Sequence, residues 1–302
     1  METHKPTLTV GIPAYNETAN IRQLLLALLN QVLSSAVLAE IIIVTDGCTD
    51  DTVAQIKSID DHRVKIIEQF ERQGLVVGQN EIVRLASGDI LVLLDGDVLP
   101  KGALFLETII QPILADPEVG MVGADTTCAT PKTFIERVIA ESHAAKSVMY
   151  RTIRNGNNIY LCHGRARALS RRFYQSLVWP VQHPEDSYSY LYCIQKHFKF
   201  VYLPTAQVIF RSPQNLTDHL RQSLRFVHGR SQLIDSFPSG FAQREYVIPF
   251  SKIIATSCAA LFRHPILTSS YALITVWGRL TYLFNHTHYH SIYEPSVTSK
   301  KI

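Results

Sequence analysis

Apolar and polar positions along the first half of the chain fall into two kinds of block that alternate. Short runs rich in Val, Ile and Leu have the length and composition of strands covered on both faces of a sheet. The longer stretches between them carry apolar residues at helical spacing. The expected strands are 7–16, 40–47, 63–69, 90–94 and 119–128, and the expected helices are 17–33, 49–58, 75–86 and 102–115. Such alternation predicts an α/β fold with a mostly parallel, Rossmann-like sheet and helices on both faces.

The second half of the chain is less regular. Helices are expected at 133–153 and 215–235, and a pair of strands is expected near 200–210. The character of the sequence changes after these elements, because long apolar stretches replace the alternating blocks. We therefore expect one large domain over 1–235 and a C-terminal helical segment over 236–302.

Two apolar stretches, 246–262 and 266–284, make up most of this C-terminal segment. Each is near the lower limit of about 17 residues for a membrane-spanning helix, and the second contains Arg279, so full spanning is not expected. One interpretation is a pair of helices that lie on a bilayer surface. Aromatic residues suited to interfacial depth are present at Trp277, Tyr282 and Phe284. The other interpretation is a buried helical hairpin, and length alone does not separate the two.

Two carboxylates follow the apolar run of residues 90–94, namely Asp95 and Asp97, with only Gly96 between them. Side chains at i and i+2 of an extended segment point the same way. Two like charges at close range repel unless a cation or a proton lies between them. Ligands of open α/β sheets bind at the carboxyl ends of the strands, and Mg²⁺ or Mn²⁺ prefers oxygen ligands. The pattern therefore favours a metal site, although Asp-Gly-Asp is also ordinary turn chemistry.

Three further features raise the case for a nucleotide site. The segment IPAYNE follows the first strand and is neither a dinucleotide fingerprint nor a P-loop, but Tyr15 offers an aromatic face for a base. Asp46 ends the second strand, where a carboxylate can accept a hydrogen bond from a base N–H, or simply belong to the turn. Glu185 and Asp186, in HPED, offer a general base, although acidic residues are also common at helix N-termini.

The overall composition narrows the classes of function. The chain has 302 residues, a formal net charge of +3 and a pI near 8.5, which is too mild a basic balance to indicate nucleic-acid binding. Its five cysteines are scattered, with no CxxC, so neither a disulfide framework nor a zinc site is expected. The first residues lack a long apolar run, so no signal peptide is expected. These features predict a cytoplasmic protein, peripheral to a membrane if the C-terminal segment binds one.

Together these segments resemble the family 2 glycosyltransferases, which are inverting enzymes with the GT-A fold. The resemblance runs over 7–230 and depends on the order of PAYNE, VTDGCTDDT, RQGLVVGQNEIVRLASGDILVLLDGDV, GRARALSRR, ED and RQSLRFVHGR. It implies an inverting hexosyltransferase that moves a sugar from a nucleotide-diphosphate sugar, expected to be a UDP-sugar, to a hydroxyl. The acceptor would be a saccharide or a lipid-linked molecule, and the cofactor Mg²⁺ or Mn²⁺.

The resemblance also implies a role for individual residues. The nucleotide-binding opening corresponds to Pro13, Ala14, Tyr15 and Glu17. Asp46 corresponds to the aspartate that contacts the base, Asp95 lies near the ribose and Asp97 ligates the metal. The loop near the donor sugar corresponds to Gly164 and Arg165. Asp186, with its neighbour Glu185, corresponds to the catalytic base, and Arg225 would grip the diphosphate.

Two positions depart from the family pattern. Leu75 stands where the family often has a lysine, so one phosphate or nucleotide contact is either missing or supplied by Arg72. Gln222, Arg225 and Phe226 resemble the QxxRW motif of processive synthases, but with Phe in place of Trp, which argues against processive synthesis.

Two other classes of function remain open. The segment LLDGDV also fits the nucleophile motif of haloacid-dehalogenase-like phosphohydrolases, in which Asp95 would attack phosphate. That motif usually lies on the first strand of its domain, whereas several strands precede it here. A non-catalytic nucleotide-sugar binding module would need Asp46 and Asp95 but not Asp186. The alternating histidines His286, His288 and His290 suit either a metal site or an exposed tail.

Overall fold

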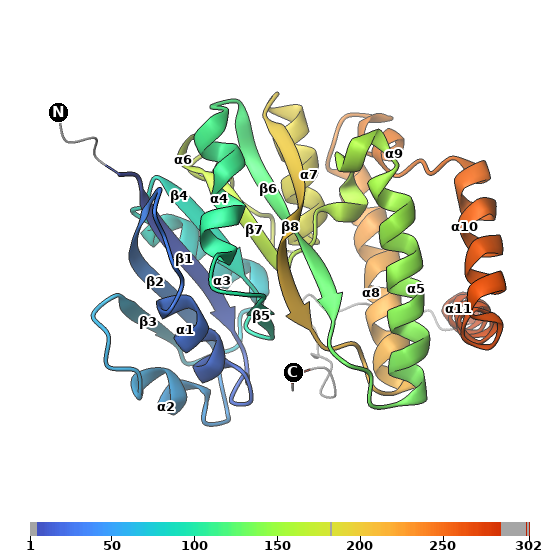
Figure 1. Ribbon diagram of the computed structural model, residues 1–302, viewed down its shortest axis with the longest axis horizontal. Coiled ribbons are helices and arrows are strands. Elements are labelled where there is room, and N and C mark those ends of the chain that lie inside the picture. Colours follow the sequence, from blue (N-terminus) through green and yellow to red (C-terminus); the bar gives the residue numbers. More distant parts are fainter. Residues whose placement is uncertain (1–4, 182, 285–299, 301) are drawn as a thin grey trace.

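The computed structural model describes residues 5–181, 183–284, 300 and 302, and one eight-stranded sheet forms its centre (Figure 1). The strands are β1 (Thr7–Ala14), β2 (Val37–Asp46), β3 (Val64–Gln69), β4 (Ile90–Leu94), β5 (Val98–Pro100), β6 (Val119–Cys128), β7 (Ala166–Ser170) and β8 (Lys199–Phe210). Their order across the sheet is β3-β2-β1-β4-β7-β6-β8-β5. The pairs from β3 to β4 and the pair β6–β8 are parallel, whereas β7 is antiparallel to both of its neighbours and β5 is antiparallel to β8. The predicted mostly parallel α/β sheet is confirmed.

Helices cover both faces of this sheet. They are α1 (Ile21–Leu29), α2 (Thr52–Lys57), α3 (Leu75–Leu85), α4 (Phe105–Ala115), α5 (Phe134–Arg151), α6 (Arg171–Tyr174), α7 (Glu185–Gln195), α8 (Leu216–Asp235), α9 (Phe241–Glu245), α10 (Phe250–Arg263) and α11 (Pro265–Phe284). One apolar core contains side chains of α1, α2 and α4, and the other contains side chains of α3, α6 and α7. Along β2, Ile41 and Ile43 enter the first core while Ile42 and Val44 enter the second. This alternation explains why the strands are apolar without interruption.

The predicted pair of strands near 200–210 is wrong, because β8 is a single strand of 12 residues. Its pairing with β6 shifts in the middle: Ala124 lies opposite Leu203, but Asp125 lies opposite Gln207. The residues between them include Pro204, which has no N–H to donate to the ladder. The turn-like residues therefore bend one strand at a bulge rather than separating two.

The turn formed by Asp95, Gly96 and Asp97, here called the DGD turn, lies where two parts of the sheet meet. Only these three residues separate β4 from β5, although three other strands lie between β4 and β5 in the sheet order. A link of this length spans at most roughly 14 Å. The carboxyl end of β8, which pairs with β5, must therefore lie close to that of β4, so the sheet curls round the DGD turn.

The last three helices lie beside the sheet, next to α5 and α8 (Figure 1). Both α10 and α11 contact α5, and α11 also contacts α8. Their outer faces are apolar and exposed, and Phe262 is 94% exposed. Large exposed apolar side chains on these helices are Phe250, Ile253, Ile254, Leu261, Phe262, Ile266, Leu273, Val276, Trp277 and Leu280. The interpretation as a buried hairpin is therefore wrong for this chain; Tyr282 and Phe284 fall outside the described side chains.

Among the described residues, the stretch Phe241–Arg263 has the length and hydropathy of a membrane span, with 6% of it buried. It is not one continuous helix, since residues 246–249 lie between α9 and α10 and include Pro249. The 14 residues of α10 extend over about 21 Å, less than the roughly 30 Å of a bilayer core. By itself, α10 is therefore shorter than the core of a bilayer.

Candidate active site

The DGD turn gathers three carboxyl groups at the carboxyl edge of the sheet. The N–H of Asp95 donates to the carbonyl of Arg165, the residue just before β7, at 3.1 Å. Glu17 comes from the end of β1 and is buried against the turn, since a Cβ placed on Gly96 would lie 2.8 Å from the Glu17 Cγ. The structure thus brings Glu17 and both aspartates together.

Electrostatics at this edge disfavour three simultaneous negative charges. Burial, followed by the neighbouring Asp97, raises the pKa of Asp95 to about 6. Burial and then Asp97 also raise the pKa of Glu17 to about 7, and the Lys300 ammonium opposes that shift. In the part of the chain that the structure describes, no group of three or more His, Cys, Asp or Glu side chains forms a ready cage for a metal. The carboxylates of Asp95 and Asp97 nevertheless fit a hard divalent cation that takes its remaining ligands from a diphosphate or water.

The loop after β1 is clamped to the loop after β2. Asn16 adopts a left-handed conformation with φ of 53°, which asparagine tolerates better than most residues. Its side-chain oxygen accepts from the Thr49 N–H at 2.8 Å, and the Glu17 N–H donates to Thr52 Oγ1 at 2.6 Å. These bonds fix the end of β1, including Pro13 and Ala14.

The ring of Tyr15 is covered by cations rather than left open. The guanidinium carbon of Arg72 lies 4.1 Å from the ring centroid, and the Lys300 ammonium lies 5.4 Å from it. Lys300 also pairs with Glu17 at 2.7 Å and donates to the carbonyls of Tyr15 and Asn16. Sequence reasoning missed Lys300 because nothing near it in the chain belongs to a recognisable motif.

Asp46 is buried at the end of β2, where it holds the loop that precedes α3. Its carboxylate accepts from the N–H groups of Gln73 at 2.5 Å and Gly74 at 3.0 Å. The close approach of this loop requires Gly47, whose φ is 63° and whose Cβ, if it had one, would lie 2.7 Å from the Arg72 nitrogen. Asp46 therefore positions Arg72 over Tyr15. Leu75, which stands where the family often has a lysine, is exposed at the start of α3.

A second acidic turn, formed by Glu185 and Asp186 and here called the ED turn, begins α7 next to the loop before β7. A Cβ at Gly164 would lie only 2.5 Å from Glu185 Oε1, so the glycine permits this approach. The Cys162 thiol donates to the Asp186 carbonyl at 3.3 Å. Burial, and then Asp186, raise the pKa of Glu185 to about 7, against the opposing charge of Arg167. The predicted loop and the predicted base are thus in contact.

Three arginines surround the two acidic turns. Arg165, Arg167 and Arg225 each oppose the rise in the pKa of Asp95. The Arg165 guanidinium carbon lies 3.7 Å from the ring centroid of Phe210, which holds it at the end of β8. Arg225 comes from α8, on which Phe226 is exposed. Sequence reasoning identified Arg165 and Arg225 but assigned nothing to Arg167, which lies within a strand.

Burial lowers the pKa of two histidines in the second half of the chain, His163 and His219. His163 lies beside His143 and the Arg165 charge, and burial lowers its pKa well below the ordinary value. His219 packs against Tyr271 of α11, and burial lowers its pKa to about 4. The side chain of His228, and residues His286, His288 and His290, lie outside the described residues.

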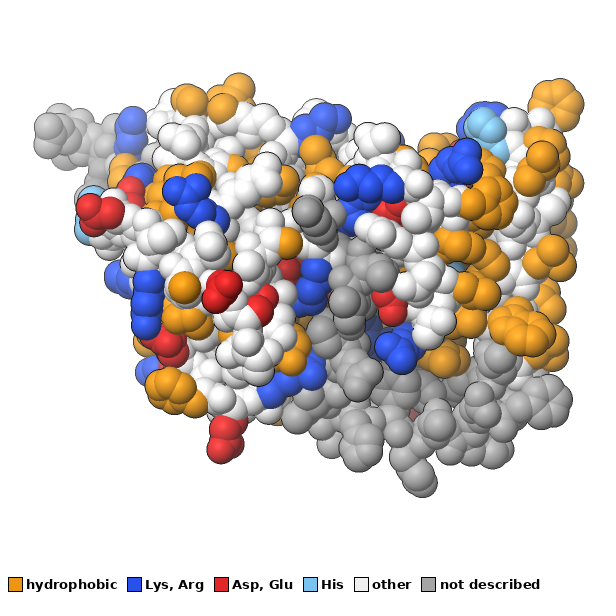
Figure 2. Space-filling model, turned by 90° about the horizontal axis from the view of Figure 1, so that it is seen from below, with side chains coloured by type: hydrophobic (Ala, Val, Ile, Leu, Met, Phe, Trp, Pro, Cys, Tyr) orange, Lys and Arg blue, Asp and Glu red, His pale blue; other side chains and the backbone are white. Residues whose placement is uncertain are grey.

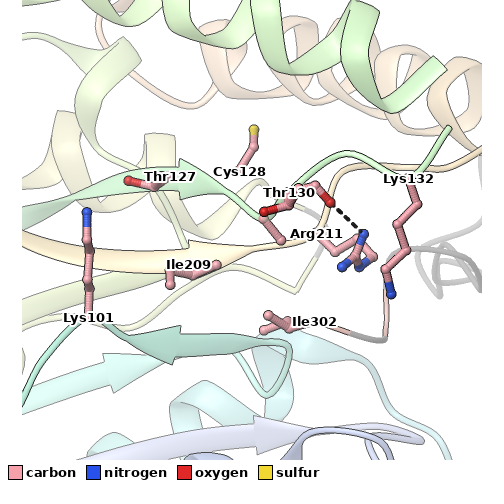
Figure 3. Close-up of a pocket in the computed structure, with 9 residues that line it drawn as sticks. Lys101, Thr127, Cys128, Thr130, Lys132, Ile209, Arg211 and Ile302 are labelled. Carbon is pink, nitrogen blue, oxygen red and sulfur yellow. Dashed lines mark hydrogen bonds between the residues drawn. The ribbon is translucent and has the colours of Figure 1, made fainter. Parts of the chain in front are cut away.

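A cavity of about 400 Å³ lies between the ends of β5, β6 and β8 (Figure 3). Its lining includes Lys101, Lys132 and Arg211, together with Ile302 and the residues at the end of β6 and just after it. Arg211 is paired with the buried carboxylate of Glu136 at 2.7 Å. Because Ile209 also lines the cavity and Phe210 follows it, this space adjoins the strand end that holds Arg165.

Comparison with known proteins gives matches along most of the chain. Residues 9–178 match the family model of glycosyl transferase family 2. Glycosyltransferase AglE of Haloferax volcanii is 33% identical over 102 residues, which is 33% of each chain. The UDP-forming cellulose synthase catalytic subunit of Pseudomonas fluorescens is 22% identical over 237 residues, covering 76% of this chain and 31% of that protein. The chain thus matches about a third of the length of these relatives.

Solved structures share the fold at low sequence identity. A mannosyltransferase from Pyrobaculum calidifontis, solved with GDP-mannose and Mn²⁺, has a TM-score of 0.64 at 18% identity, over 94% of this chain and 89% of that one. Glucosyl-3-phosphoglycerate synthase from Mycobacterium tuberculosis, solved with Mn²⁺, UDP and phosphoglyceric acid, has a TM-score of 0.53 at 17% identity, over 78% and 80% of the two chains. The predicted GT-A fold is confirmed. With more than half of its length matching the family model, the chain belongs to glycosyl transferase family 2.

Proposed function

We propose that this protein transfers a hexose from a nucleotide-diphosphate sugar to an acceptor hydroxyl with inversion of the anomeric centre. The observation that carries the proposal is the convergence of two acidic turns on one edge of the sheet: Asp95 bonds to the loop that Gly164 brings against Glu185. One turn suits a metal-bound diphosphate and the other suits a general base. A transferase of this type needs both within reach of one sugar.

The donor end of the site suits UDP. Asp46 has oxygens that accept hydrogen bonds at the end of β2, and a further lone pair can accept from the N–H of uracil. Pro13, Ala14, Tyr15 and Glu17 border this end. One solved relative was crystallised with UDP and another with GDP-mannose, so the choice of UDP rests on the resemblance to UDP-using members of the family.

Mg²⁺ or Mn²⁺ would be held by Asp97, with Asp95 beside it, and when bound it would neutralise charge on the departing diphosphate. The fit rests on hard oxygen ligands and on a pKa of Asp95 that is raised by burial and by Asp97. The cations of Arg165 and Arg225 face the same carboxylates. They would add to the stabilisation of the leaving group.

Asp186 is the proposed general base, and Glu185 shares its environment. Burial, and then the charge of Asp186, raise the pKa of Glu185 to about 7. Asp186 would take the proton from the acceptor hydroxyl. The oxygen of that hydroxyl would attack the anomeric carbon on the side opposite the diphosphate. A single displacement of this kind inverts the centre and needs no covalent enzyme intermediate.

Replacement of Asp186 tests the proposal. The Asp186→Asn variant should bind UDP in the presence of Mn²⁺ as tightly as the wild type, by isothermal titration calorimetry, but turnover should fall by about 10²–10⁴-fold. Turnover is measured as UDP release with a panel of UDP-sugars. Wild-type turnover in this variant would contradict the base assignment. A wild-type protein that turns over no donor would favour the binding module, and hydrolysis of p-nitrophenyl phosphate would favour the phosphohydrolase.

We also propose that residues 236–302 form a segment that contacts an anionic membrane surface, with the catalytic domain over 1–235. Hydrophobic side chains gather over α10 and α11 at the right of Figure 2. Residues 246–284 contain Lys252, Arg263, His264 and Arg279 but no acidic residue, a combination that suits anionic lipid. A cytoplasmic location at such a surface would bring a lipid-linked acceptor within reach.

Vesicle sedimentation tests this contact. The protein should sediment with vesicles of phosphatidylglycerol more than with vesicles of phosphatidylcholine. The Phe262→Ser variant should sediment less. Phe70 is 91% exposed, nearly as much as Phe262, and lies after β3 at the far edge of the sheet, so Phe70→Ser is the matched control. Equal loss in both variants, or no sedimentation of the wild type, would contradict a specific membrane surface.

A further inference from the structure

Arg167 is a charged residue at the centre of the sheet. It lies in β7, opposite Leu93 of β4 and Gly123 of β6, and its exposed fraction is 0%. An arginine buried without compensation is strongly destabilising, because its charge loses the solvation of water. A strand position that would suit an apolar side chain therefore carries a guanidinium group.

Those contacts converge on one backbone carbonyl of the ED turn. Arg167 Nη1 donates to the Glu185 carbonyl at 3.1 Å and to Ser189 Oγ at 2.9 Å. The Trp179 indole N–H reaches the same two oxygens, at 3.0 Å and 2.8 Å. The Ser189 hydroxyl also donates to the Glu185 carbonyl, at 2.5 Å. Three buried donors thus hold the peptide group that joins Glu185 to Asp186.

Arg167 also connects the strand that leads into the DGD turn with the ED turn, because it lies opposite Leu93, two residues before Asp95, and bonds to the Glu185 carbonyl. Its charge opposes the rise in the pKa of Glu185. Its Nε and Nη2 are buried and make no hydrogen bond within the described part of the chain. Arg167 is therefore not simply neutralised by one carboxylate. The protein keeps a cation at this point while using only one of its nitrogens for hydrogen bonds.

We propose that Arg167 is a positioning residue that holds the ED turn in place relative to the DGD turn, acting through the Glu185 carbonyl. Since Arg167 is buried, it contacts neither donor nor acceptor. Arg167 instead determines where the carboxylate of Asp186 lies relative to the acceptor hydroxyl during proton transfer. This inference rests on the proposed role of Asp186 as the base.

The test separates the catalytic constant from donor binding. Arg167→Met keeps most of the aliphatic volume but removes the charge and the donors, and we expect kcat to fall by about 10²-fold, as misplacement by about 1 Å can cost. Arg167→Lys restores a cation and one donor, so kcat should recover partly. In both variants KM for the UDP-sugar, and the affinity for UDP with Mn²⁺, should stay within about twofold of the wild type.

Two further variants guard against a merely structural effect. Trp179→Phe removes one of the three donors to the same carbonyl and should lower kcat less than Arg167→Met does. Arg172→Met is the matched control, because Arg172 lies just beyond β7 with its guanidinium over the ring of Phe198, and its kcat should not change. If Arg167→Met does not fold, as judged by circular dichroism, Arg167→Lys and Trp179→Phe carry the test.

The outcomes distinguish this inference from the proposed function. A kcat equal to that of the wild type in folded Arg167→Met, or in both Arg167→Lys and Trp179→Phe, would overturn the positioning role of Arg167. The assignment of Asp186 as the base would still stand if Asp186→Asn were inactive. Equal losses in kcat and UDP affinity would also overturn it. In an Asp186→Asn background, Arg167→Met should cause no further loss, because the group that it positions is already absent.

Discussion

The DGD turn and the ED turn are both pairs of acidic residues at the same edge of the sheet, yet the protein supports them differently. The DGD turn has a third carboxylate packed on it, that of Glu17, which pairs with Lys300, and three arginines oppose the rise in the pKa of Asp95. The ED turn is held by direct hydrogen bonds from buried donors to its backbone. One site thus has an excess of negative charge that an added cation would relieve, whereas the other has its stabilising groups built in. The same residue chemistry therefore points to metal binding in one place and to proton transfer in the other.

The largest expected effect comes from removing the carboxylate of Asp97. In Asp97→Ala, turnover with a UDP-sugar should fall by about 10³-fold, because the charge on the leaving diphosphate is no longer countered by a held cation. Mn²⁺ should also stop raising the melting temperature of the variant in the presence of UDP, a shift that the wild type should show. Asp116→Ala, at an exposed ion pair with Lys199, is the control. A variant at Asp97 that kept full transfer in EDTA would end the metal assignment.

The second test uses the two glycines on which the acidic turns depend. A Cβ at Gly96 would press on Glu17, and one at Gly164 would press on Glu185. We expect Gly96→Ala to raise KM for the donor by several-fold with a smaller change in kcat. Gly164→Ala should instead lower kcat by about tenfold or more, because its Cβ would displace Glu185 and with it the neighbouring base, Asp186. Steady-state kinetics in Mn²⁺ would show this split, and identical kinetic losses in the two variants would mean that the turns do not have separate tasks.

The smallest expected effect is on stability and concerns Glu185. Burial and Asp186 raise its pKa from 4.5 to about 7, so the folded protein keeps a proton that the unfolded chain releases. The stabilisation from this group is fully present below pH 4.5 and is lost as pH rises through about 7. Glu185→Gln cannot lose a proton, so its stability relative to the wild type should rise by about 2–3 kcal/mol between pH 5 and pH 8. Urea unfolding at both pH values measures this, and a difference that does not change with pH would contradict the raised pKa.

The position of several residues at the proposed donor end could be predicted because they lie at or just beyond the ends of strands. Uninterrupted Val, Ile and Leu runs mark the parallel strands, and side chains just beyond their ends must meet at one edge, so Asp46 and Asp95 were found from the pattern. The covering of the Tyr15 ring could not be predicted in this way. Its ring is covered by Arg72 because Asp46 and Gly47 bring that loop close, and this depends on backbone geometry that the residue types alone do not specify.

The exposure of the C-terminal helices could not be predicted from the sequence either. Their apolar composition was evident, but composition does not distinguish a buried hairpin from an exposed one. Packing of α10 and α11 against α5 covers only one side of the pair and leaves residues such as Phe262 outside. The break at 246–249 likewise divides the stretch Phe241–Arg263 into two short helices, α9 and α10.

By itself, the sequence determined the alternation of strands and helices, the family and the identity of the acidic residues, because these depend on local periodicity and on short segments in a set order. Only the tertiary structure decided that β8 is one bent strand, that Lys300 lies against Glu17, and that Arg167 holds the ED turn. Each of these depends on contacts between residues far apart in the chain. Such contacts depend on the curl of the sheet and on how charges are shared within it, and neither is encoded in any one short segment.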